Sequence, residues 1–538
     1  MALWFAPETY TDEERAVLSR YVTNLDGPVF ALVNLPEVVK GALFARYSRT
    51  SKPLRRLFLD EFAGQVEEAG TGPPAGVGVE RAERLYERVF FEYGDDSVAQ
   101  LGGVHLACEQ ASQLLAKALE WGRLAAYLEQ STRYMRYDDR PGGRWRLTVP
   151  PAIAGTPLEE RFGAFADRAF ETYARCFDRV ADLYRRLYPK DPADPDGVYR
   201  STITAKTCDT LRGLLPAATR SNVGIYATGQ AYEQLLLRLR AHPLAEMREY
   251  ADLMLVELRK VIPAFLRRVD LEDRGVAWSR YLRETRERTE EIAAKVLAGV
   301  EGGPREEVVL TDHDPEGEVK VTAAALYAAS DLPDDELLEA ARRMTPEERA
   351  EVLRAYVGER GNRRHKPGRA FERTGYRFDV LCDFGAFRDL QRHRLLTIEW
   401  QRLTTRHGYE TPPEVEAAGL RPDWTRVMEA SAELEGEFLE AGHQEAAQYA
   451  VTMAHRIRFV MQMNAREAMH LTELRSSPQG HPVYRRVAQA MHRLIGEVHP
   501  GIAAAMSYVD HSAVELERLE AERRAEARRR AMEGGSAG

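Results

Sequence analysis

Two arginines flank a histidine at Arg392-His393-Arg394. The guanidinium group of arginine stays charged at any physiological pH and donates paired hydrogen bonds, a geometry that suits phosphate oxygens. On residue type alone, such a triplet is more often a solvated surface turn than a ligand site. The triplet is therefore a candidate anion site whose assignment depends on the rest of the chain.

A second polar run, E-Q-S-T-R-Y, occupies positions 129–134. If this run were helical, Glu129 and Arg133 would lie four residues apart on one face and would form a surface ion pair worth roughly a few tenths of a kcal/mol. The alternative is that the run binds a ligand. The run alone leaves both interpretations open.

The two runs belong to one signature that occurs twice, and both copies are incomplete. Residues 121–134 read W-G-R-L-A-A-Y-L-E-Q-S-T-R-Y and keep the second part of the signature. Residues 392–404 read R-H-R-L-L-T-I-E-W-Q-R-L-T and keep the first part. The two preserved parts lie more than 250 residues apart, and neither copy could serve alone.

Other segments repeat in the same order, which indicates a tandem duplication. A-L-F-A-R-Y-S at 42–48 is echoed by A-L-Y-A-A-S at 325–330, and residues 229–240 are echoed by residues 464–475. Turn-forming residues concentrate at 302–304 and 312–317, which suits a boundary. We therefore predict one domain over residues 1–300 and a second over residues 301–538.

Taken together, these segments resemble the signature of the flavin-dependent thymidylate synthases (ThyX), which make dTMP with FAD instead of a catalytic cysteine. The matching pieces are R-H-R at 392–394, E-Q-S-T-R-Y at 129–134, A-F-E at 370–372, N-A-R at 464–466 and the arginine at 475. The resemblance covers nearly the whole chain. It implies a helix-rich α+β fold in which two tandem ThyX-like domains form an intramolecular pseudo-dimer.

The resemblance also implies roles for individual residues. The residues matched to flavin binding are Arg392, His393, Arg394, Glu372, Asn464, Arg466 and His470. Those matched to binding of the uracil nucleotide are Glu129, Gln130, Ser131, Arg133, Arg212, Arg392 and Arg475. Ser131 and Arg475 are the catalytic candidates: the serine serves the phosphate, and the arginine lies against the pyrimidine, where a fixed positive charge favours ionisation at N3.

In the family that this chain resembles, each active site lies between subunits of a homotetramer. One subunit supplies the R-H-R and N-A-R segments, and its neighbour supplies E-Q-S-x-R-Y and the arginine before Leu-Pro. The resemblance therefore implies one composite site per chain, built from the preserved parts of both copies, and a homodimer that forms a pseudo-tetramer. We expect the opposite site, which would use residues 121, 122 and 229 with 400, 402, 404 and 448, to be inactive.

Some positions depart from the family pattern. The segment G-H-E-T-P-F-E-H is replaced at 94–100 and at 366–372, so its leading histidine is missing from both copies, and His365 lies only nearby. Asp389 replaces the glutamine that precedes R-H-R, and its charge could repel a phosphate if it pointed inward. His470 replaces an asparagine and could bind flavin or simply pack on its helix, whereas Arg240, the counterpart of Arg475, is expected to be structural.

If the chain is active, the resemblance implies conversion of dUMP, or a related pyrimidine nucleotide, to dTMP. Methylenetetrahydrofolate would donate the one-carbon unit, NADPH would reduce FAD, and FAD would carry the redox chemistry. The alternative is a non-catalytic or redirected relative that binds flavin or a nucleotide, because a fold does not determine a function.

Composition sets further limits on the class of protein. The chain has 538 residues, 44% hydrophobic and 30% charged, with no apolar run of the roughly 18 residues that a membrane span needs. We expect no membrane contact and a cytoplasmic location, because the N-terminus has no secretory pattern. The net charge of -9 argues against nucleic acid as a partner. Four cysteines without metal-like spacing are expected to be buried, with no metal site.

The elements that would position these residues are mainly helical. Apolar residues recur at three- and four-residue intervals over 249–268 and 334–356, and the charged tail over 514–530 also predicts a helix. Alternation of polar and apolar residues predicts strands at 146–149 and 377–381.

Overall fold

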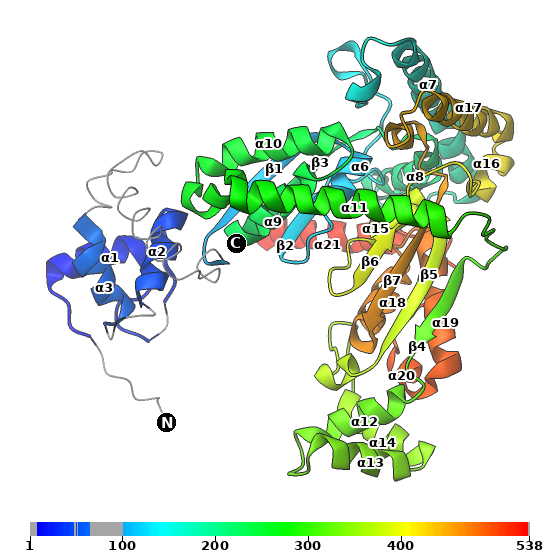
Figure 1. The fold of residues 1–538 in the computed structure, drawn as a ribbon. Helices are drawn as coiled ribbons and strands as arrows, with labels where there is room; N and C mark the ends of the chain where they lie inside the picture. Colours follow the sequence, from blue (N-terminus) through cyan, green and yellow to red (C-terminus); the bar gives the residue numbers. More distant parts are fainter. Residues whose placement is uncertain (1–7, 29, 48–49, 51, 65–99, 536–538) are drawn as a thin grey trace. The chain divides into compact units, whose positions relative to one another are not determined.

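The computed structural model describes residues 8–28, 30–47, 50, 52–64 and 100–535. The first replaced copy of the G-H-E-T-P-F-E-H segment, at 94–99, therefore lies outside the described residues. The fold is helix-rich with small antiparallel sheets, as the α+β prediction requires (Figure 1). Residues cluster into two compact units: one holds residues 1–109, 124–129 and 222–299, and the other holds 110–123, 130–221 and 300–538.

The first unit contains a small helical cluster and a three-stranded sheet. Helices α1 (Asp12–Tyr21), α2 (Glu37–Tyr47) and α3 (Leu54–Glu61) surround buried apolar side chains such as Leu18 and Phe58. The sheet has the order β1-β3-β2, with β1 at Gly103–Ser112, β3 at Arg220–Thr228 and β2 at Ala125–Glu129. Helices α9 (Gly229–Arg240), α10 (Ala245–Arg259) and α11 (Ala277–Val296) also belong to this unit.

The second unit is built around a four-stranded antiparallel sheet of order β4-β5-β7-β6. Its strands are β4 (Val308–His313), β5 (Gly375–Asp383), β7 (Arg456–Asn464) and β6 (Thr397–Trp400). Buried and less buried side chains alternate along β5 and β7, as a half-buried sheet requires. The predicted strand at 377–381 is confirmed within β5. Helices α15 (Phe384–Leu390), α18 (Ala465–Arg475) and α19 (Pro482–Val498) pack against this sheet.

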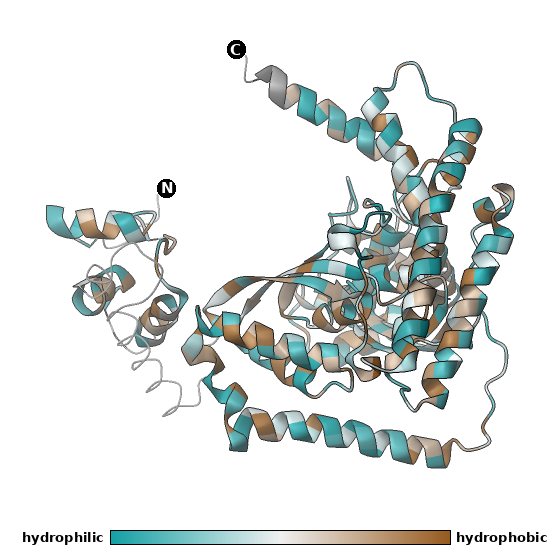
Figure 2. Cartoon of the chain, turned by 90° about the horizontal axis from the view of Figure 1, so that it is seen from above, coloured by the Kyte–Doolittle hydropathy of each residue, from teal (hydrophilic) through white to brown (hydrophobic). Residues whose placement is uncertain are grey.

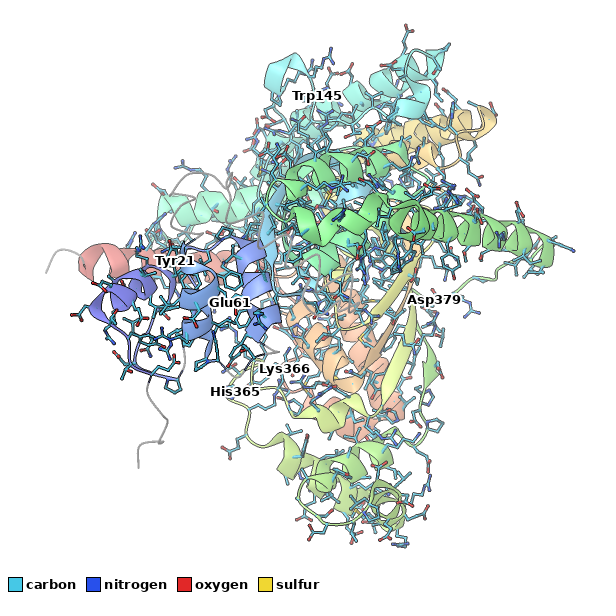
Figure 3. All side chains as sticks on the ribbon, turned by 60° about the vertical axis from the view of Figure 1, so that its left-hand side comes forward. Tyr21, Glu61, Trp145, His365, Lys366 and Asp379 are labelled. Atoms are coloured by element: carbon cyan, nitrogen blue, oxygen red, sulfur yellow. The ribbon has the colours of Figure 1, made fainter. Side chains whose placement is uncertain are left out.

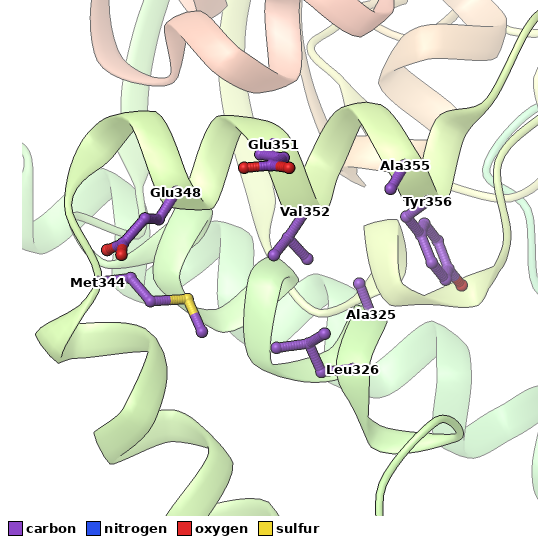
Figure 4. Close-up of a pocket in the computed structure, with 8 residues that line it drawn as sticks. All are labelled: Ala325, Leu326, Met344, Glu348, Glu351, Val352, Ala355 and Tyr356. Atoms are coloured by element: carbon purple, nitrogen blue, oxygen red, sulfur yellow. The ribbon is translucent and has the colours of Figure 1, made fainter.

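The second unit holds further helices. They include α6 (Gln113–Leu119), α7 (Pro157–Leu187), α8 (Asp196–Leu211), α16 (Pro413–Ala417), α17 (Arg421–Glu440), α21 (Leu519–Gly535) and α20 (Pro500–Ala505), of which α20 packs on α19. Helix α21 packs on α8 and is predominantly hydrophilic towards the C-terminus (Figure 2). Helices α13 (Asp334–Arg343) and α14 (Pro346–Val357) both pack on α12 (Gly317–Tyr327). An apolar cavity of about 510 Å³ between α12 and α14 contains none of the predicted site residues (Figure 4).

Segments from the two sequence halves interlock within the second unit. The amide of Ala217 donates to the carbonyl of Val451 at 2.8 Å, and the amide of Met453 donates to the carbonyl of Leu215 at 2.8 Å. An isolated antiparallel bridge joins Pro216 to Thr452. The compact units therefore do not coincide with the two sequence halves. The division at residue 300 concerns the repeated sequence segments, and it stays a prediction.

Three expectations about local structure need correction. Residues 146–149 are not a strand, since only Leu147 makes an isolated bridge, and Pro150 and Pro151 follow without amide donors. The helix predicted at 249–268 ends at Arg259, and Pro263 begins a separate 3₁₀ segment. Residues 334–356 form two helices because Thr345 and Glu348 make a capping box that starts α14.

The tail helix begins at Leu519 rather than at residue 514. The prediction of buried cysteines is confirmed, because all four cysteine side chains are buried. Among the described residues, no helix is both long enough and apolar enough to span a bilayer.

We expect Gly213→Ala to weaken the contact between the two halves. A methyl group at Gly213 would lie 2.6 Å from the Trp424 ring and 3.0 Å from the Ala454 methyl group. Overpacking of this kind costs about 1–3 kcal/mol, so the midpoint of thermal unfolding should fall. The matched control is Gly163→Ala within α7, where the added methyl meets no atom within 4 Å and should leave stability equal or higher. Equal stability of the two variants would contradict this packing account.

Candidate functional site

The E-Q-S-T-R-Y run is not helical, so the surface-pair interpretation is wrong. Glu129 is the last residue of β2, and residues 130–134 form the extended segment and turn that follow. Ser131 is half-buried, and its hydroxyl accepts a hydrogen bond from the amide of Arg133 at 3.2 Å. The carbonyl of Gln130 accepts a hydrogen bond from Ser221 at 3.1 Å. The local geometry therefore presents Ser131 beside a buried arginine.

Arg133 is buried and fully engaged with two side chains from distant parts of the chain. Its Nε and Nη2 atoms donate to the two carboxylate oxygens of Asp209 at 2.7 and 2.6 Å. Its Nη1 atom donates to the Tyr484 hydroxyl at 2.6 Å. Burial alone would raise the pKa of Asp209, but the charge and hydrogen bonds of Arg133 outweigh it and lower this pKa to about 2. Arg133 thus joins α8 of the first half to α19 of the second.

A second buried carboxylate, Asp389 at the end of α15, also faces arginines. Its oxygens lie 3.4 Å from Arg392 Nη1, 3.5 Å from Arg212 Nη1 and 4.0 Å from Arg475 Nη1. Burial opposes ionisation, but these arginines and Arg133 hold the pKa of Asp389 well below its usual range. Asp389 therefore points inward, where it neutralises part of the surrounding positive charge.

Arg212 does not lie on a helix surface. It directly follows Leu211, the last residue of α8, and is only 3% exposed. Its Nη2 atom is buried with no hydrogen-bond partner. Asp383 and Arg212 both border Gly385, where an added methyl group would lie 2.8 Å from Asp383 Oδ1 and 3.0 Å from Arg212 Nε. Burial raises the pKa of Asp383 to about 6, although the charge of Arg212 acts in the opposite direction. A buried guanidinium with a donor to spare is suited to an anionic ligand.

Arg475, His393 and Glu467 form a directional chain of hydrogen bonds. Arg475 Nε donates to His393 Nε2 at 3.0 Å, and because arginine can only donate, that ring nitrogen must accept. The proton of His393 is then on Nδ1, which donates to Glu467 at 2.9 Å. Burial and the charges of Arg475 and Lys366 lower the pKa of His393 well below its ordinary value. The histidine is therefore neutral and holds Arg475 in one orientation.

Ligand atoms of His393, Glu467 and His470 lie within 4.8 Å of one another, the spacing of a metal site. Both ring nitrogens of His393 are already used, and the one nearest Glu467 carries the proton. The positive charges of Arg475 and Lys366 also act on His393. Its surroundings therefore oppose a second positive charge, and the cluster is better suited to orienting Arg475 than to holding a cation.

A polar cavity of about 470 Å³, within the usual size of a ligand pocket, lies beside the basic triplet. Glu372 and Asn464, both predicted flavin ligands, line it with residues 395–397. Arg123 also lines it and donates to the Thr397 hydroxyl at 3.1 Å, so both signature copies contribute.

The other predicted flavin residues lie around this region in different settings. Arg466 donates to the carbonyl of Pro367 at 2.9 Å and lies 3.5 Å from Glu372. Arg392 and Arg394 are exposed, whereas His393 is buried and its ring lies 5.3 Å from that of His470. These positions are compatible with a ligand that enters from the exposed side of the triplet.

His365, near the place of the missing family histidine, and Arg240, the first-half counterpart of Arg475, both bind other parts of the chain. His365 lies on an exposed loop, where its ring bonds to Gly361 and Asn362 (Figure 3). Arg240 is paired with Asp252 at 2.8 Å and Asp270 at 2.6 Å, in agreement with a structural role.

Several residues of the predicted inactive site contact one another or their neighbours in the second half. The rings of Trp121 and Trp400 meet edge to face at 5.7 Å. Arg402 pairs with Glu445, and Gln448 accepts a hydrogen bond from the amide of Leu403 at 3.2 Å.

The central feature of the second unit is a group of arginines that we call the arginine cluster, all of them buried or half-buried except the exposed Arg392. Its members are Arg133, Arg212, Arg392, Arg475 and Arg518. The carboxylates that face them are Asp209, Asp383 and Asp389. Five cations against three anions leave surplus positive charge in a largely dehydrated place. Sequence reasoning missed Arg518, Asp209 and Tyr484, because no pattern in the chain linked these positions to the signature.

Replacing Asp209 tests the cluster's internal balance. We expect Asp209→Asn to lower the free energy of unfolding by about 3–5 kcal/mol at neutral pH, because it leaves Arg133 buried without its counter-ion. The folded pKa of Asp209 is lowered from 3.8 to about 2, so ionised Asp209 stabilises the fold above pH 4, and this contribution is lost as the pH falls towards 2. The pH-linked part is about 2 kcal/mol.

Denaturant unfolding of both proteins between pH 6 and about pH 2.5 measures this difference. The matched control is Asp178→Asn on the exposed face of α7, which should track the wild type at every pH. A wild-type advantage over Asp209→Asn that did not shrink in acid would contradict the assigned role of Asp209.

Comparison with known proteins gives a consistent family assignment. The family model described as thymidylate synthase complementing protein matches residues 42–264 and 307–501. A UPF0159 protein of Chlamydia pneumoniae is 39% identical over 524 residues, covering 96% of this chain and 98% of that protein. A UPF0159 protein of Thermoplasma acidophilum is 30% identical over 510 residues, covering 90% of this chain and 97% of that protein.

Two further similarities are more distant. A flavin-dependent thymidylate synthase of Clostridium tetani is 24% identical over 177 residues, which are 32% of this chain and 66% of that protein. The solved structure of a UMP/dUMP methylase, PolB from Streptomyces cacaoi bound with 5-Br dUMP, aligns with a TM-score of 0.30 and 19% identity over 37% of this chain and 93% of that one. Because the family model matches in two separate regions that together span most of the sequence, the chain belongs to the thymidylate synthase complementing protein family.

Proposed function

We propose that this chain is a flavin-dependent thymidylate synthase homologue that methylates dUMP to dTMP at one composite site per chain. Family membership supports nucleotide methylation of the thymidylate synthase type. The single observation that carries the finer proposal is the arginine cluster, in which residues from both sequence halves meet and Arg212 keeps a buried donor without a partner. We take this cluster as the nucleotide end of the site and the neighbouring cavity as the flavin end.

The charge of the cluster favours the phosphate of a nucleotide. A phosphate monoester carries nearly two negative charges at neutral pH, and arginine forks bind its oxygens through charge-assisted hydrogen bonds. Such bonds are stronger in a dehydrated site than in water. Arg212 has a buried donor without a hydrogen-bond partner. Ser131, two residues before Arg133 in the sequence, offers a hydroxyl group. Arg133 contributes positive charge while its own hydrogen bonds go to Asp209. The aspartates keep the arginines in place when no ligand is bound.

Arg475 supplies the electrostatic activation in this proposal. A fixed cation beside the pyrimidine stabilises the ring after loss of the N3 proton, and the electron-rich ring can then react at C5 without a cysteine adduct. The neutral His393 accepts from Arg475 Nε and is itself held by Glu467, so the guanidinium has little freedom to turn away. Preorganisation of this kind is what makes a single charge effective in catalysis.

The cavity beside the basic triplet fits the flavin end. Glu372, Asn464 and Arg123 give it polar walls, and Arg466 stands behind Glu372. Bound FAD would supply the hydride that completes the methyl group, with NADPH as reductant and methylenetetrahydrofolate as one-carbon donor. The chain's own part is to orient the cofactor, with Arg392 and Arg394 at the exposed edge of the triplet.

The interlocking of residues 130–221 with residues 300–538 in one compact unit supports docking of the two halves as a pseudo-dimer. On the same reasoning, two chains would form a pseudo-tetramer. A cytoplasmic location suits a nucleotide-synthesis enzyme of this kind.

A non-catalytic or redirected flavin- or nucleotide-binding relative is the second candidate. One observation favours it: the donor atoms of Arg133 are hydrogen-bonded to Asp209 and Tyr484. Arg133 therefore cannot bind a phosphate through these atoms without breaking a buried ion pair. His365 is also tied to its own loop and does not replace the missing histidine.

A visible absorption spectrum of the purified chain, recorded with FAD and then with dUMP, separates these candidates. We expect a bound flavin band that shifts on addition of dUMP. Arg392→Ala should abolish flavin retention, and Ser131→Ala should weaken the dUMP response about tenfold, because one hydrogen bond to a charged group is lost. Arg402→Ala, which alters the predicted inactive site, is the matched control and should keep both signals.

A protein that binds flavin and dUMP but makes no dTMP from the three substrates would support the redirected relative. Absence of a flavin band under every condition would refute the enzyme proposal.

A further inference from the structure

Arg518 lies in a C-terminal segment that follows the family-matched residues, which end at 501. We infer that Arg518 is an additional anion-binding residue of the proposed nucleotide site and that it contacts the phosphate of a nucleoside monophosphate. This inference rests on the proposed function and adds a residue that neither copy of the signature contains.

The segment is fixed on both sides of Arg518. Immediately before it, Glu517 forms a buried ion pair with Lys206 of α8 at 2.7 Å. Five residues later, Arg523 pairs with both oxygens of Asp194 at 2.6 and 2.9 Å. Helix α21 packs along α8, the same helix that carries Asp209. The position of Arg518 beside the arginine cluster is therefore set by contacts that do not involve its own side chain.

The guanidinium group of Arg518 is held in a buried position, but two of its donor atoms have no hydrogen-bond partner. The side chain is 6% exposed, and the guanidinium lies over the Tyr134 ring at 3.9 Å from its centroid. Its Nη2 atom is 3.9 Å from Asp209, too far for a hydrogen bond, and its Nε and Nη1 atoms are buried with no hydrogen-bond partner. Asp209 therefore does not satisfy it, and each of its carboxylate oxygens already accepts a hydrogen bond from Arg133.

Burying a charged group whose donors are unpaired lowers the stability of the fold. A residue with this cost is therefore a candidate for a binding role. The Tyr134 ring fixes the plane of the Arg518 guanidinium group, while Nε and Nη1 have no hydrogen-bond partner. We expect this arrangement of an arginine that binds an anion when the ligand is absent. Arg212 has the same property, and both arginines act on the carboxylate of Asp209. A phosphate offers three terminal oxygens and can accept from both arginines, whereas a carboxylate offers only two oxygens.

The test is calorimetric titration of the full chain with dUMP, deoxyuridine and inorganic phosphate. Arg518→Gln should weaken binding of dUMP and of inorganic phosphate about tenfold or more, because a charge-assisted contact is lost. Binding of deoxyuridine, which lacks the phosphate, should not change. The matched control is Arg528→Gln, the same charge change on the exposed face of α21, which should bind all three as the wild type does.

Thermal unfolding without ligand separates a binding role from a structural one. If Arg518 binds the phosphate, Arg518→Gln removes a buried, unsatisfied charge and leaves the unfolding midpoint equal or higher, while the rise caused by dUMP shrinks. If Arg518 instead only neutralises Asp209, the midpoint falls and dUMP affinity is retained, which overturns the inference.

Failure of the proposed function has a different signature. A wild type that binds inorganic phosphate but not dUMP refutes the nucleotide assignment, and a loss of phosphate binding in Arg518→Gln would still support an anion-binding Arg518. Equal dUMP affinity in Arg518→Gln and Arg528→Gln overturns the inference while leaving the proposed function intact. A wild type that binds neither ligand overturns both.

Discussion

The second unit depends on keeping several arginines charged and close together away from water. Repulsion among Arg133, Arg212 and Arg475 would be severe in a dehydrated interior without counter-ions. Asp209 and Asp389 make the arrangement possible, since each remains ionised although it is buried. The two carboxylates come from different sequence halves, so the ion network also fixes how residues 130–221 pack against residues 300–538. The contacts that hold the two halves together are therefore made by the same arginines that we propose as ligand-binding residues.

Under the proposed function, this sharing explains how a duplicated chain would keep one whole site although each copy of the signature is incomplete. Once Arg133 is paired with Asp209 and hydrogen-bonded to Tyr484, the second half has a fixed place for the first half's segment. The opposite combination of segments has filled with contacts such as the edge-to-face pair of Trp121 and Trp400. Arg518, from the C-terminal segment, lies beside the same cluster, 3.9 Å from Asp209.

The sequence was sufficient to predict the family, the helix-rich α+β class and the strand at 377–381, because these depend on motifs and periodicity. It could not reveal that Arg133 is anchored or that Asp389 points inward, because both facts depend on partners far away in the chain. The strand expected at 146–149 failed because tertiary contacts and two following prolines overrode a short alternation. Arg518 was missed for a related reason: its segment reads as a charged helix, and only packing on α8 buries it.

The most direct test of one composite site per chain is the binding stoichiometry of flavin and of dUMP, measured by equilibrium titration against an accurate concentration of the full chain. The account predicts one flavin and one nucleotide per chain, whatever the number of chains in the assembly. Two of either ligand per chain would show that both signature copies still form sites and would contradict the account.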